Sequence, residues 1–211
     1  MKKKIVFFSM ICMLTAGLSA KQIGLVLDIG PLFTHTAYYD WGVSDNALIR
    51  KSYWSSSAGR IGGGFDVQLR YTFYKKLGVY TLFNAAFPAR PHNDTQQYGA
   101  YLIDWQLGLG WTFNLEKNFD VFFGGGLAAG GTGEKTRSPQ KTIDTANVGF
   151  GVNCIFSYMF THMVGMYFGV SDNIYVPVNR KAKIGSITTS KQPDERLVNA
   201  LNLKLGLQLA F

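Results

Sequence analysis

The chain has 211 residues, of which 47% are hydrophobic, 15% aromatic and only 16% charged, with 24 glycines and a formal net charge of +8. A disordered chain is excluded, because such chains are poorer in apolar residues and richer in charge. The charged fraction is also low for an ordinary soluble domain, in which about a quarter of residues are charged. The mean hydropathy is nevertheless only +0.04, so glycine and uncharged polar residues must balance the apolar ones.

The first 20 residues have the three parts of a secretory signal peptide. Residues 2–4 are lysines, residues 5–14 are mostly apolar, and small residues precede a cleavage site after Ala20 or one residue earlier. The apolar run is too short to span the roughly 30 Å of hydrocarbon in a bilayer. We therefore expect residues 1–20 to be cleaved and residues 21–211 to form the mature protein. Its net charge falls from +8 to +5, because the leader contains three lysines and no acidic residue.

Cysteine and histidine indicate neither a disulfide framework nor a metal site. Cys12 lies in the predicted leader, so the mature chain keeps only Cys154. A single cysteine has no internal partner, and three scattered histidines, His35, His92 and His162, do not form a zinc motif. We expect neither a cofactor nor a metal.

The main pattern along the mature chain is a strict alternation of apolar residues with small or polar ones. It is clearest from Tyr101 to Phe113, and such a period of two indicates a strand with two different faces. The alternation recurs in residues 61–73, 148–160 and 201–211, and in weaker form in residues 23–33, 77–87, 119–130 and 163–174. The sequence therefore predicts eight strands.

The stretches between the predicted strands alternate in length. Residues 34–59, 88–97, 131–144 and 175–195 are long and polar, whereas residues 74–76, 114–118 and 161–162 are short. An up-and-down sheet with long loops at one end only is typical of a bacterial outer-membrane barrel. An even number of strands would leave both termini on the periplasmic side.

Two other folds compete with this interpretation. Residues 148–171 carry no formal charge and are long enough for a membrane helix, but their glycines and polar residues fall on alternate positions, which opposes a helix. A soluble barrel would have to bury the Trp, Phe, Tyr and Leu face inside eight strands, where there is little room. The opposite face, rich in Gly, Ala, Asn, Asp and Ser, fits a narrow lumen better. Gly124 to Gly126 would then relieve crowding within a strand.

The chain thus resembles the small eight-stranded outer-membrane β-barrel proteins, the group that contains OmpX, OmpW and the membrane domain of OmpA. The most specific element is the alternation of Leu203, Leu205, Leu207 and Leu209 with a terminal Phe211, which is similar to the β-signal read by the barrel-assembly machinery. The resemblance implies an all-β, eight-stranded antiparallel up-and-down transmembrane barrel in the outer membrane of a diderm bacterium. It also implies a monomer whose partners are outer-membrane lipids and that machinery.

The lumen-facing positions predict a polar network. Its charged members are Asp28, Asp66, Arg70, Asp104, Asp120 and Lys204. Acids and bases should meet there, because an unpaired buried charge is costly. We expect Lys204, Asp28 and Asp66 near mid-barrel, and Arg70 lower, near Asp120 only if the stagger of the strands permits. The network would plug the lumen, or alternatively form a narrow gate for ions or small solutes.

The long loops carry the remaining candidates for ligand contact, which are Tyr38, Tyr39, Trp41, Tyr53, Trp54, Arg180, Lys181 and Lys183. They form either a solvated rim with an aromatic girdle or a surface that binds an anionic partner, such as lipid A phosphates, sulfated host glycans or another surface protein. We expect no enzymatic activity, because the sequence spacing points to no pair of nucleophile and general base. We also expect no nucleic-acid binding. The predicted role is structural and surface-display, with a narrow channel as the alternative and a lipid-modifying enzyme as the least favoured.

Overall fold

The protein is described by a computed structural model that covers residues 24–44, 47–52, 60–74, 76–88, 97–136, 141–184, 187–191 and 196–211. Within these ranges the chain is almost entirely strand. The strands are β1 (Gly24–Ser44), β2 (Ala47–Ser52), β3 (Arg60–Tyr74), β4 (Leu77–Pro88), β5 (Gln97–Glu116), β6 (Phe119–Thr136), β7 (Lys141–Met159), β8 (Val164–Ile184), β9 (Ile187–Lys191) and β10 (Arg196–Ala210). The predicted signal peptide lies outside the described residues.

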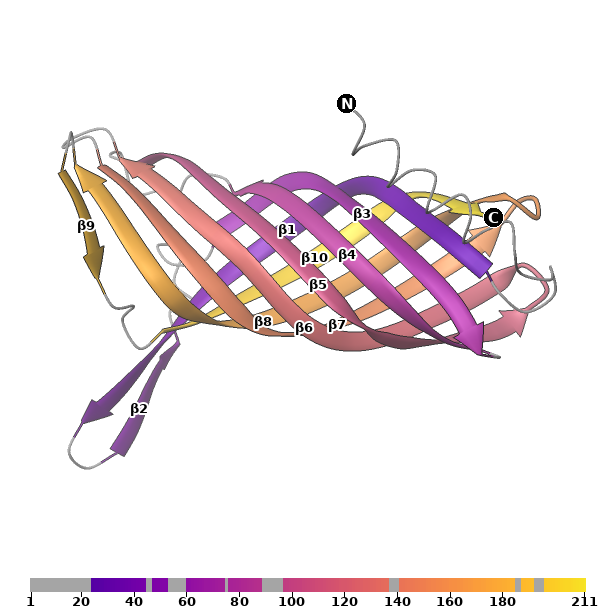
Figure 1. Cartoon of the computed structure of the whole chain (residues 1–211), viewed down its shortest axis with the longest axis horizontal. Coiled ribbons are helices and arrows are strands. Elements are labelled where there is room, and N and C mark those ends of the chain that lie inside the picture. Colours follow the sequence, from indigo (N-terminus) through magenta and orange to yellow (C-terminus); the bar gives the residue numbers. More distant parts are fainter. Residues whose placement is uncertain are drawn as a thin grey trace, which may run out of the picture.

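Eight of these strands form one closed antiparallel barrel (Figure 1). Their order is β10-β1-β3-β4-β5-β6-β7-β8, and β8 pairs with β10 to close the circle, as in the register Lys204 with Gly169. Neighbours in sequence are neighbours in the sheet, which is the predicted up-and-down topology. The fold class expected from the alternation is therefore confirmed, and β2 and β9 are additional strands outside the barrel wall.

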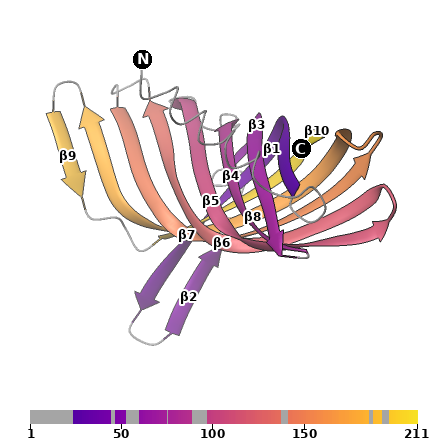
Figure 2. The same ribbon diagram turned by 45° about the vertical axis from the view of Figure 1, so that its right-hand side comes forward.

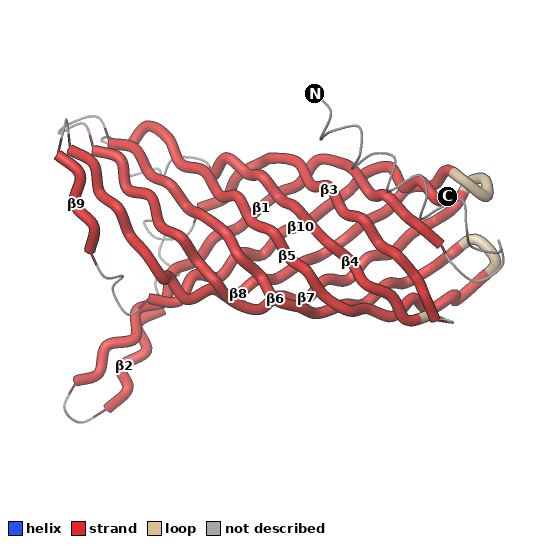
Figure 3. The backbone as a smooth tube through the Cα atoms, viewed as in Figure 1, coloured by secondary structure: helices blue, strands red, loops and turns tan. Residues whose placement is uncertain are grey.

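The end of the barrel that carries short connections also carries Gly24 and Phe211. The connections at residues 117–118 and 160–163 are tight, as predicted, and Phe211 N donates to Leu25 O at 2.9 Å. We call this the short-turn end. The strands are tilted relative to the long axis of the barrel, so that those of the front and back walls cross in the view of Figure 3.

At the opposite end, which we call the rim, the strands extend far into regions predicted as loops. β6 and β7 pair as far as Thr136 with Lys141, β1 continues into a hairpin with β2, and β8 continues into a hairpin with β9. Figure 2 shows the β1–β2 hairpin diverging from the wall. The prediction of long loops at 34–59, 131–144 and 175–195 is thus wrong over most of their length. Outside the membrane both faces meet water, so strands there lose the apolar alternation by which they are recognised.

The outer face of the barrel is apolar. Large side chains such as Phe33, Leu127 and Phe150 are more than 60% exposed, and they alternate with buried residues along each strand. Residues 148–171 form parts of β7 and β8 and the turn between them, which excludes the helical alternative. No helix that is long and apolar enough to span a membrane occurs in the described residues. The outward apolar face also contradicts a soluble barrel and fits a hydrocarbon environment.

The inner face contains larger side chains than the sequence analysis expected. Two buried apolar clusters occupy the lumen: Leu32, Ala86, Leu102, Ala128, Tyr175, Val198 and Ala200 toward the rim, and Tyr80, Leu82, Phe122, Ile155 and Tyr167 toward the short-turn end. The expectation of a lumen face of mainly small and polar residues thus holds only in part, because aromatic and leucine side chains also lie there. The space comes from inward glycines on neighbouring strands, since a Cβ at Gly124 would lie 2.6 Å from Cε1 of Tyr80.

Candidate functional site

A buried ion pair links the first two strands of the barrel wall inside the lumen. Arg70 on β3 donates from Nε to Asp28 Oδ2 on β1 at 2.9 Å and from Nη2 to Oδ1 at 3.1 Å. Both residues face inward because their neighbours along each strand face lipid. The two-point geometry matches the planar guanidinium to the carboxylate and satisfies both charges without water.

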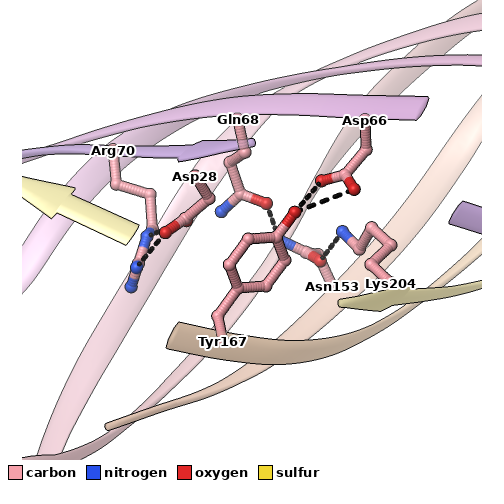
Figure 4. Close-up of polar contacts among 7 residues, drawn as sticks. All are labelled: Asp28, Asp66, Gln68, Arg70, Asn153, Tyr167 and Lys204. Atoms are coloured by element: carbon pink, nitrogen blue, oxygen red, sulfur yellow. Dashed lines mark hydrogen bonds and ion pairs between the residues drawn. The ribbon is translucent and has the colours of Figure 1, made fainter. Parts of the chain in front are cut away.

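Lys204 and Asp66 take neutral partners (Figure 4). Lys204 Nζ donates to Asn153 Oδ1 at 2.7 Å, and Asn153 Nδ2 donates to Gln68 Oε1 at 2.8 Å. Asp66 accepts from the phenol of Tyr167, whose oxygen lies 2.8 and 2.9 Å from the two carboxylate oxygens. A chain of hydrogen bonds thus joins β10, β7 and β3 across the lumen, while Tyr167 ties β8 to β3.

Asp104 and Asp120 lie apart from this chain. Asp104 is fully buried and accepts from Asn84 Nδ2 at 2.8 Å. Asp120 is only half-buried, close to the short-turn end, and accepts from Asn114 Nδ2 at 2.5 Å. Of the six charged residues predicted to line the lumen, five are buried there. Arg70 does not pair with Asp120, because the stagger of the strands places Asp28 within its reach instead.

Tyr167 is the contributor that sequence analysis missed. It lies on the inner face of β8 between Gly165 and Gly169, and small neighbours of this kind were a signal that a large inward side chain had room. Gly169 has a related role, since a Cβ there would lie 3.2 Å from Cε of Lys204.

Aromatic packing closes the lumen toward the short-turn end. The rings of Tyr80 and Phe122 meet edge to face with centroids 5.3 Å apart, and the guanidinium carbon of Arg70 lies 5.1 Å from the centroid of Phe122. Some buried polar atoms in the lumen have no hydrogen-bond partner among the described residues, including both side-chain polar atoms of Gln106 and of Asn173. Buried groups of this kind are ordinarily satisfied by bound water.

The predicted ligand-contact residues belong to the rim. Lys181 and Lys183 are exposed on the distal part of β8, and the backbone of Arg180 belongs to the same strand. Tyr38, Tyr39 and Trp41 lie on the distal part of β1, but their side chains are outside the described set, and Tyr53 and Trp54 lie outside the described residues altogether. The structure therefore places the three basic residues together on one strand.

The terminal leucines line the lipid-facing side of β10. Leu203, Leu205 and Leu207 are exposed, Leu209 is half-buried, and Phe211 is exposed at the short-turn end. The alternation of the predicted assembly signal is therefore a one-sided apolar stripe along the strand that closes the barrel.

A sequence-family model described as "Domain of unknown function (DUF2715)" matches residues 14–211. No curated protein matches the chain. Among solved structures, the chain is similar to the outer membrane protein OprG from Pseudomonas aeruginosa, with 13% identity, a TM-score of 0.60, and coverage of 90% of this chain and 97% of that one.

Two further solved structures give the same result. The outer membrane protein AlkL in DMPC lipid bilayers is 14% identical, with a TM-score of 0.54 and coverage of 92% of this chain and 93% of that one. Neisserial surface protein A is 14% identical, with a TM-score of 0.52 and coverage of 92% and 100%. The fold is therefore that of the small outer-membrane β-barrels.

Proposed function

The chain belongs to the family described as a domain of unknown function, DUF2715, and we propose that it is an integral outer-membrane protein that displays a polyanion-binding rim. In this proposal the filled barrel is an anchor, its termini are periplasmic, and the strand extensions at the rim are the working surface. The C-terminal stripe that ends at Phe211 would direct its assembly.

The observation that carries this proposal is the length of the strands. β8 has 21 residues, whereas a tilted transmembrane strand needs only about 9–11 to cross a bilayer. Apart from Asp172, its outward-facing residues are apolar from Val164 to Val178, after which charged residues follow. The distal part of β8 and its hairpin partner β9 therefore project beyond the membrane, which is more structure than a simple connection requires.

The chemistry of this projection favours an anionic ligand. Lys181 and Lys183 are exposed on β8, and exposed Ile184 and Ile187 flank the turn to β9. Ammonium groups on one strand suit a polymer or lipid with several sulfate or phosphate groups, because several linked ionic contacts together raise the binding affinity. The shared ligand chemistry is thus a polyanion, whether a sulfated polysaccharide or the phosphates of lipid A.

The test is retention of the purified barrel on immobilised dextran sulfate, with binding to vesicles containing lipid A as a second arm. The double variant Lys181→Glu/Lys183→Glu should lose retention about tenfold or more, and binding should weaken as salt is raised. Lys76→Glu/Lys117→Glu makes the same charge change at the short-turn end and should bind as the wild type does. Equal loss in both double variants, or in neither, would contradict the proposal.

A narrow channel is the second candidate, and the buried polar atoms along the lumen favour it. The two apolar clusters oppose it, because they lie in the lumen on both sides of the polar network. Eight strands enclose little more than their own side chains.

A further inference from the structure

The outward side of β7 and β8 changes from apolar to polar at neighbouring positions. Val148 of β7 pairs with Val176 of β8, and both side chains are about half exposed. Closer to the rim, Ala146 pairs with Asn179, and the outward residues beyond them on both strands are polar or charged. Asp172 of β8 is a charged exception on the apolar side. The apolar band on this part of the wall therefore ends between these two registers.

Beyond this boundary, exposed lysines lie on β6 and β8: Lys135, Lys181 and Lys183. Lys135 of β6 pairs with Thr142 of β7, and Thr142 pairs in turn with Lys183 of β8. Directly paired residues share one face of the sheet, so the two lysines flank Thr142 at backbone positions about 10 Å apart, at ~4.8 Å per strand. This is the outer face, because alternation along β7 places Thr142 on the same side as the exposed Ala146.

A carboxylate on the same face is already engaged. Asp144 of β7 pairs in register with Lys181, but its Oδ1 accepts a hydrogen bond from the phenol of Tyr101 at 2.7 Å. The Tyr101 ring reaches Asp144 across Gly133 of β6, where a Cβ would overlap the ring. Within the described residues, none of the three lysines has an ion-pair partner. Three ammonium groups thus accompany one carboxylate, and these four side chains together carry a net positive charge.

We propose that this outer face of β6, β7 and β8 binds the phosphorylated headgroup of an outer-leaflet lipid. The inference rests on the proposed polyanion binding, since Lys181 and Lys183 belong to both, and it adds Lys135 of the neighbouring strand pair. The direction of the side chains favours a lipid over a soluble polysaccharide. They point away from the lumen just beyond the apolar band, where the headgroups of the surrounding lipids lie.

The chemistry of the face suits a phosphate group. Phosphate oxygens accept hydrogen bonds from ammonium and hydroxyl groups, and Thr142 supplies a hydroxyl between Lys135 and Lys183. A second hydroxyl belongs to exposed Thr188 of β9, which pairs with Lys183 and continues the sheet beside β8 at the rim (Figure 1). The acyl chains of the same lipid would contact the apolar band, which includes the exposed Phe150 of β7. The protein would thus hold one lipid by its headgroup and by its chains.

The test measures binding of lipid A to the purified barrel in detergent, by native mass spectrometry over a titration of the lipid. Lys135→Gln/Lys183→Gln should weaken binding about fivefold for each lysine removed, which is the weight of one basic residue at an anionic membrane surface. Asp144→Asn keeps the hydrogen-bond acceptor but removes the opposing charge, so it should bind more tightly than the wild type. Lys76→Gln/Lys117→Gln, at the short-turn end, is the matched control and should bind as the wild type does.

Lipid A without its phosphates separates headgroup recognition from contact with the acyl chains, and the wild type should bind it more weakly than intact lipid A. Heat-modifiable migration on gels checks that every variant is folded. Equal binding of the two lipids, or undiminished affinity in Lys135→Gln/Lys183→Gln, would overturn the inference. If Lys181→Glu/Lys183→Glu still loses retention on dextran sulfate in that case, the proposed polyanion surface stands without the lipid site. A wild type that retains neither ligand would contradict both.

Discussion

At the scale of single residues, glycines leave the space that aromatic rings occupy inside this barrel. Gly108 and Gly124 face Tyr80, and Gly110 faces Phe122. An added Cβ at any of these glycines would lie inside the normal contact distance of a ring atom. Tight packing of this kind leaves little room for adjustment, so even one added methyl group should destabilise the barrel.

Gly124→Ala should lower the free energy of unfolding by about 1–3 kcal/mol, because its Cβ overlaps the Tyr80 ring. The measurement is the urea midpoint of tryptophan fluorescence for barrels refolded into lipid vesicles. Gly125→Ala is the control, since its Cβ would have Gly151 O as its nearest neighbour at 3.6 Å. An equal effect of both substitutions would show that strand propensity, and not ring packing, decides the outcome.

At the scale of elements, β10 both closes the barrel and presents its outward leucine stripe. It pairs with β1 from Arg196 to Ala210 and with β8 over most of its length. Phe211 continues this closure by exchanging backbone hydrogen bonds with Leu25, while its side chain is exposed. The backbone of Phe211 and its ring can therefore have different roles, one in closure and one in recognition.

Phe211→Ala keeps the backbone hydrogen bonds and removes the ring. We expect several-fold less heat-modifiable barrel in the outer membrane of expressing cells, but normal refolding of the purified chain into detergent, if the ring is part of an assembly signal. Phe160→Ala removes another exposed ring at the short-turn end and should assemble normally. Equal yields of the two variants in cells would contradict a recognition role.

At the scale of the whole molecule, buried side chains occupy the lumen of the described barrel at several levels. Apolar clusters lie toward both ends, and the hydrogen-bonded chain from Lys204 to Gln68 crosses the space between them. The barrel therefore has a lumen occupied by side chains, an apolar outer face, and strand extensions with exposed lysines at the rim.

Purified wild-type protein in planar bilayers should show no unitary conductance steps, and Lys204→Ala should show none either, because the apolar clusters remain. Replacing Tyr80, Phe122, Leu102 and Tyr175 together by alanine removes four large side chains from the two clusters and should produce leak currents. Unitary steps in the wild type whose ion selectivity changes in Lys204→Ala would instead support the channel.

Much of the fold could be predicted because alternation reports directly on which face each residue occupies. The strand from Tyr101 to Phe113 lies within β5 with the expected faces outward and inward. The rim extensions were not predictable in this way, because β8 beyond Val178 carries charged residues and no longer has an apolar outer face. Tyr80 was missed as a lumen residue, since the room that it occupies is created by glycines on other strands. Tyr167 was missed although Gly165 and Gly169 flank it on its own strand.

The amino-acid sequence by itself determined the faces of the strands, their number in the wall and the side of the barrel that meets lipid. A period of two is a local property, and it needs no knowledge of neighbours. Only the tertiary structure decided which inward residues meet, because closure of eight tilted strands sets a stagger that no single strand encodes. That stagger places Arg70 on Asp28 and Tyr167 on Asp66, and the same closure brings Asp172 of β8 to Asn199 of β10.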